Sequence, residues 1–88
     1  MNFPEPFTLL AYDDLAYRSP TPSDVRAVID MLGLTADQVA ALVGMKDGRA
    51  VRRWLAPEDS KTHAQIDYAA WRLLLIEAGL VAFPRSSS

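Results

Sequence analysis

The chain contains no cysteine and one histidine. Without thiols, neither disulfides nor cysteine-ligated metal sites can form, and a reducing cytoplasm is the expected environment. His63 has no second histidine or carboxylate cluster beside it, so we expect no metal site and no cofactor. No apolar run approaches the roughly 20 residues of a membrane-spanning helix, and the first residues lack a signal-peptide pattern.

Motifs of enzymes are also missing from the sequence. There is no glycine-rich phosphate loop and no serine or cysteine elbow. Asp13 and Asp14 are adjacent carboxylates, but no base accompanies them, so we interpret them as solvated acids. A chain of 88 residues has little room for a substrate cleft. The sequence therefore indicates neither an enzyme nor a small-molecule ligand.

The net charge is −2, but the charges are distributed unevenly. Residues 1–45 hold two basic residues against six acids, a net of −4. Residues 46–56 hold four basic residues against one acid, a net of +3. Because local charge determines a contact surface, this short cationic segment is the first candidate for a binding site.

Two segments begin with a helix-capping pattern and continue with an apolar stripe. In the stretch TPSD at residues 21–24, the threonine is able to cap the helix and the proline takes the first helical position. The aspartate side chain is able to accept the backbone N–H of the capping threonine. Thr35 repeats this pattern, and Gln38, three residues later, takes the place of the aspartate. Apolar residues follow each start at helical spacing. The sequence therefore predicts helices over residues 22–32 and 36–43.

A third helix is predicted over residues 48–55, starting next to Asp47. Val51 and Trp54 lie at i and i+3 and form its buried side. The rest of the helix circumference carries the three arginines, Arg49, Arg52 and Arg53. Pro57 prevents extension of the helix, because proline also restricts the residue before it.

The last predicted helix begins after a cap at Asp67 and stops at Gly79. Apolar side chains cover so much of its circumference that it is either central to the core or faces a partner. A long polar connection, residues 56–65, precedes it.

The second and third predicted helices are joined by a tight turn at Gly44, and Ala40 is small enough for a close helix crossing. This is a helix-turn-helix arrangement, whose second helix enters the DNA major groove. Arginine is able to donate two parallel hydrogen bonds to guanine there. Double-stranded DNA is therefore the expected partner.

The segments LTADQVAALVGM and AVRRWL resemble the helix-turn-helix of the Xre/Cro-type bacterial and phage repressors. The positions that match are the capping threonine, Ala40, Gly44, Val51 and Trp54. The length and the stretch YAAWRLLL also look like small autoregulatory repressors of plasmids and phages, including those of anti-CRISPR operons. The resemblance implies a transcriptional repressor that binds an inverted-repeat operator, commonly at its own promoter. Two departures are Ala36, where the family usually has a DNA-contacting glutamine, and Gly48, an extra residue.

Two sets of DNA contacts are predicted, and the family positions imply only the base-facing set, in which Arg52 lies closer to the backbone. The predicted base contacts are Arg49 and Arg53, flanked by Gly48 and Ala50. The predicted phosphate contacts are Lys46, Arg52, Thr35, Lys61 and Thr62. For Lys61 and Thr62, an ordinary surface loop is the equal alternative.

The expected fold class is all-α, a compact helix-turn-helix domain of four to five helices. We expect residues 21–80 to form this domain, residues 1–20 an N-terminal arm and residues 81–88 a C-terminal tail, with a frayed end as the equal alternative for residues 1–20. Residues 7–17 fit either a short strand or a helical turn, and residues 81–83 are able to pair with the arm as a short strand.

We expect a homodimer, because two copies double the modest contact area of one helix-turn-helix. The predicted dimer interface is Trp71, Leu75, Ile76 and Leu80, with a contribution from the arm. The alternative is a protein-binding adaptor, or an inhibitor that mimics DNA, on the same scaffold, supported by the acidic first half. In either case we expect a bacterial cytoplasmic protein with no membrane association, nucleoid-associated if it binds DNA.

Overall fold

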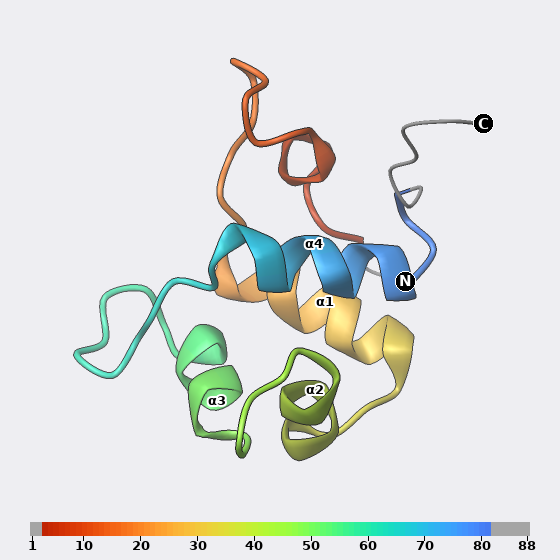
Figure 1. Ribbon diagram of the computed structural model, residues 1–88. Coiled ribbons are helices and arrows are strands. Elements are labelled where there is room, and N and C mark those ends of the chain that lie inside the picture. Colours follow the sequence, from red (N-terminus) through yellow and green to blue (C-terminus); the bar gives the residue numbers. More distant parts are fainter. Residues whose placement is uncertain (1–2, 82–88) are drawn as a thin grey trace.

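The computed structural model describes residues 3–81, and over this range the chain forms four α-helices and one short 3-10 helix (Figure 1). The elements are η1 (Pro6–Leu9), α1 (Pro22–Leu32), α2 (Ala36–Leu42), α3 (Arg49–Leu55) and α4 (Tyr68–Glu77). No strand occurs within residues 3–81. The predicted all-α fold is confirmed.

The capping patterns determine where α1 and α2 begin. Thr21 Oγ1 accepts the Asp24 N–H at 3.3 Å, and the Asp24 carboxylate accepts the Thr21 N–H at 2.9 Å. Thr35 and Gln38 make the same reciprocal pair at 3.2 and 2.9 Å. Gly33 ends α1 with a φ of 68°, a left-handed conformation that suits glycine. Both predicted helix starts are confirmed.

One hydrophobic core joins all four α-helices. Trp54 is 4% exposed, so its predicted place on the buried side of α3 is confirmed. The largest side chains with less than 2% exposure are Trp71, Leu74, Leu75, Val25, Val28, Val39, Val51 and Thr8. Since α1 contacts both α3 and α4, it connects the α2–α3 pair to the C-terminal helix.

The N-terminal arm lies across α4, on the side away from α2 and α3 (Figure 1). Trp71 Nε1 donates to the Thr8 carbonyl at 2.9 Å, and Arg72 Nη1 donates to the Leu9 carbonyl at 2.7 Å. Of the two conformations that residues 7–17 fit, residues 7–9 take the helical one as part of η1. Residues 82–83 of the second predicted strand lie outside the described residues, as does most of the predicted tail.

A cluster of aromatic rings packs the second half of the arm against the start of α4. Tyr12, Tyr17 and Tyr68 have ring centroids 5.1–5.7 Å apart, which suits edge-on aromatic contacts. Burial raises the pKa of the Tyr17 phenol above its usual value, opposed by a hydrogen bond to Ser19. These rings join the arm to the start of α4.

Two of the predicted dimer contacts are wrong. Trp71 and Leu75 are each 0% exposed within one copy of the chain. The core covers α4 on one side and the arm covers it on another, so the apolar surface of α4 is largely explained without a partner. Ile76 and Leu80 remain partly exposed.

Candidate nucleic-acid interface

Helices α2 and α3 pack at one end of the molecule, on the side of α1 away from the arm (Figure 1). Ala40 is fully buried, as its small size predicts for a helix crossing. Gly44 follows α2 with a φ of 80°, and the Met45 N–H then donates to the Ala40 carbonyl at 2.7 Å. The backbone therefore turns sharply enough to bring α3 against α2.

Gly48 is a structural residue of this pair, and its predicted place among the base-facing residues is wrong. It is buried, and its N–H donates to Asp37 Oδ1 at 2.8 Å. A β-carbon at this position would lie 2.5 Å from that oxygen and 3.0 Å from the carbonyl carbon of Ala36. The extra glycine thus permits the close approach of α3 to the first turn of α2. The two residues that face each other at this contact, Gly48 and Ala36, are both small.

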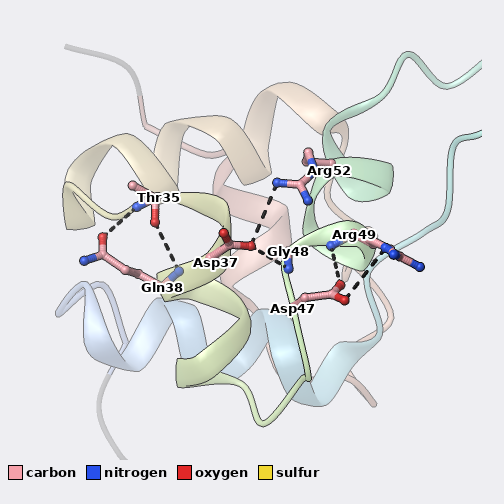
Figure 2. A network of polar contacts seen from close by, with 7 residues as sticks. All are labelled: Thr35, Asp37, Gln38, Asp47, Gly48, Arg49 and Arg52. Carbon is pink, nitrogen blue, oxygen red and sulfur yellow. Dashed lines mark hydrogen bonds and ion pairs between the residues drawn. The ribbon is translucent and has the colours of Figure 1, made fainter.

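Arg49 and Arg52 project outward from α3 (Figure 2). The Arg49 side chain is 85% exposed, with Nε 3.8 Å from Asp47 Oδ2. The Arg52 side chain is 60% exposed, with Nη1 3.9 Å from Asp37 Oδ1. Exposed pairs at such distances contribute only about 0–1 kcal/mol, so both guanidinium groups are free to exchange partners. The opposite face of α3 is held in the core by Val51 and Trp54.

Arg53 points to a different neighbour. Its Nε donates to the Thr62 carbonyl at 3.1 Å, and its own carbonyl accepts the Ala64 N–H at 3.1 Å. The side chain thus ties the loop of residues 56–65 to the end of α3. Ala50, also predicted near the bases, is half-buried against the core. All three arginines of α3 are exposed, but only the Arg53 side chain donates a hydrogen bond to the following loop.

The predicted phosphate contacts other than Arg52 are also at exposed positions. Lys46 is exposed in the turn before α3, and Lys61 and Thr62 are exposed in the loop after it. Thr35 is exposed at the start of α2, where its hydroxyl oxygen accepts the Gln38 N–H. The chain thus brings cations from the turn, the helix and the loop to one end of the molecule.

Asp37 was not predicted to belong to this site. It stands 11 residues before Gly48 in the sequence, and its carboxylate accepts the Gly48 N–H and also faces Arg52. The signal that could have identified it is the extra glycine, since a glycine without a turn requirement indicates a close neighbour.

Other types of site find little support in the part of the chain that the structure describes. Residues 3–81 contain no group of three or more His, Cys, Asp or Glu side chains placed to hold a metal ion. His63 Nδ1 is 3.0 Å from the Ala56 carbonyl, inside the loop after α3. None of the described helices has the length and apolarity that crossing a bilayer requires.

Two curated proteins of Escherichia coli are similar to this chain, and both are named transcriptional repressor protein KorC. One is 43% identical over 65 residues, which cover 72% of this chain and 71% of the relative. The other is 39% identical over 66 residues, which cover 73% of this chain and 72% of the relative. No protein-family model matches the chain.

Proposed function

The chain belongs to the KorC family of transcriptional repressors, and from this premise we propose that it binds a specific operator with α3 in the major groove. The observation that carries the proposal is the outward projection of Arg49 and Arg52 from a helix anchored by Val51 and Trp54. An α-helix fits the major groove, and an outward arginine is able to donate to guanine O6 and N7.

The distribution of charge also supports DNA binding through α3. Residues 46–56 carry a net of +3 in a chain whose total is −2. Each phosphate neutralised by a lysine or arginine releases condensed counterions from DNA, so binding by such a face weakens as salt rises.

A homodimer that reads an inverted repeat is part of the proposal. The large apolar side chains that are exposed within residues 3–81 all belong to the arm: Phe3 (60%), Phe7 (47%), Tyr12 (68%) and Leu15 (104%). Ile76 and Leu80 are partly exposed near the end of α4. These two surfaces are the candidates for the dimer contact. Repression would follow from occlusion of a promoter, with the chain's own promoter as the first candidate, in the bacterial cytoplasm.

The proposal is tested by fluorescence anisotropy with the DNA upstream of the chain's own gene. We expect salt-sensitive, sequence-dependent binding by the wild type. A bidentate arginine–guanine contact contributes ~1–3 kcal/mol, so Arg49→Ala should weaken operator binding by at least several-fold. Arg52→Ala, which removes a phosphate contact, should weaken binding to all sequences and lower the salt slope by about one unit. Arg26→Ala is the matched control for the loss of one exposed positive charge, because Arg26 is 57% exposed and belongs to α1, outside the α2–α3 pair. Unchanged affinity in both α3 variants would contradict the assigned recognition helix.

The exposed arm also favours a second candidate, a protein-binding module on the same scaffold. An arm that presents Phe3, Phe7 and Tyr12 to solvent is able to contact a protein partner. If the wild type shows no shift with any duplex at low salt, this candidate replaces the repressor.

A further inference from the structure

We propose that Asp37 competes with DNA phosphate for Arg52 and thereby lowers the affinity of the free protein for DNA. This inference rests on the proposed function, because it assigns a role within the same surface. Asp37 acts through Arg52, so it is a positioning residue.

The geometry places two tasks on one carboxylate (Figure 2). Asp37 Oδ1 accepts the Gly48 N–H at 2.8 Å and lies 3.9 Å from Arg52 Nη1. The first contact is a short hydrogen bond that ties α2 to the start of α3. The second is longer than a hydrogen bond and leaves both side chains largely exposed, at 73% for Asp37 and 60% for Arg52.

The two contacts respond differently to an approaching phosphate. The backbone N–H of Gly48 is buried, so its bond to Asp37 persists. The guanidinium of Arg52 is open to solvent, and a phosphate oxygen offers it the same charge as the carboxylate with better hydrogen-bond geometry. Arg52 therefore exchanges Asp37 for phosphate when DNA binds. The freed carboxylate stays beside the polyanion and opposes binding.

A purely structural role is the alternative reading of Asp37. An acid in the first turn of a helix interacts favourably with the helix dipole, and the Gly48 bond stabilises the α2–α3 pair. Replacement by asparagine separates the two roles. The amide oxygen of Asp37→Asn still accepts the Gly48 N–H, whereas the negative charge beside Arg52 is removed.

The experiment measures affinity for operator and for random duplex over a series of salt concentrations. Loss of the charge in Asp37→Asn should raise affinity at low salt by about threefold or more and steepen the log–log salt slope by up to about one unit. In an Arg52→Gln background, the same substitution should give little gain. Thermal unfolding verifies that each variant is folded.

Asp30→Asn is the matched control. Asp30 also faces an arginine at 3.9 Å, but on α1, and the substitution changes the net charge equally. The inference is overturned if Asp37→Asn gains no more affinity than Asp30→Asn, or if the gain persists without Arg52. Wild-type protein that binds no DNA at low salt would overturn the proposed function, and this inference with it, whereas normal operator binding without the Asp37 effect overturns the inference alone.

Discussion

Gly48 shows how much of the α2–α3 geometry depends on one residue without a side chain. Its φ of −81° is open to any residue, so the requirement for glycine is purely one of space. Asp37 and Ala36 occupy the volume that a β-carbon would need. The Gly48→Ala substitution must therefore displace α3 from α2 or break the Asp37 hydrogen bond.

We predict that Gly48→Ala lowers the free energy of unfolding by about 1–3 kcal/mol, as forced overpacking does in a close-packed interior. Urea denaturation followed by circular dichroism measures the change. Ser23→Ala, on the exposed side of the first turn of α1, is the control and should have little effect. A Gly48→Ala variant as stable as the wild type would show that α2 and α3 do not approach this closely.

At the scale of elements, α4 owes its stability to the arm as well as to the core. The indole of Trp71 is completely buried, and its N–H reaches the Thr8 carbonyl across 63 residues of sequence. Thr8 is itself 1% exposed, so its carbonyl would lack a partner if the indole donor were removed. The arm is thus held by specific hydrogen bonds and not only by apolar contact.

We predict that Trp71→Phe releases the arm and costs at least ~1–3 kcal/mol, the penalty for an unsatisfied buried acceptor. Trypsin digestion at the exposed Arg18 gives a direct readout, since cleavage there should become faster. Trp54→Phe makes the same ring replacement on the buried side of α3 and serves as the control. Equal cleavage rates in the two variants would mean that the indole bond does not hold the arm.

The sequence predicted the elements better than their contacts. The starts of α1 and α2 follow from local hydrogen bonds between Thr21 and Asp24 and between Thr35 and Gln38, which are visible at a spacing of three. The anchoring of the arm depends on main-chain carbonyls, which carry no sequence signal. For the same reason Trp71 and Leu75 were assigned to a partner when the arm and the core of the same copy bury them.

The candidate site was predictable in part. The cationic segment and the buried pair Val51 and Trp54 follow from composition and helical spacing. The family positions did not reveal that Gly48 is buried, because an inserted residue changes the register of the turn. The link from Asp37 to Arg52 joins two helices, and one-helix patterns do not report such contacts.

At the scale of the whole molecule, the dimensions leave room for the proposed homodimer on DNA. The principal extents are 41 × 26 × 25 Å, so two copies side by side are able to place equivalent helices about 34 Å apart, one turn of DNA. The α2–α3 face lies at the opposite end from the arm (Figure 1). A second copy of the chain that contacted the arm would therefore leave Arg49 and Arg52 accessible to DNA.

The most direct test of the central claim is affinity cleavage of DNA by a tethered iron chelate. The chain has no cysteine, so Lys46→Cys and Leu15→Cys each create a unique attachment site. Lys46 adjoins α3, whereas Leu15 is fully exposed on the arm at the other end. The account predicts two symmetric clusters of cuts in the operator from position 46 and none from position 15. Cuts from position 15 alone, with the protein bound, would contradict it.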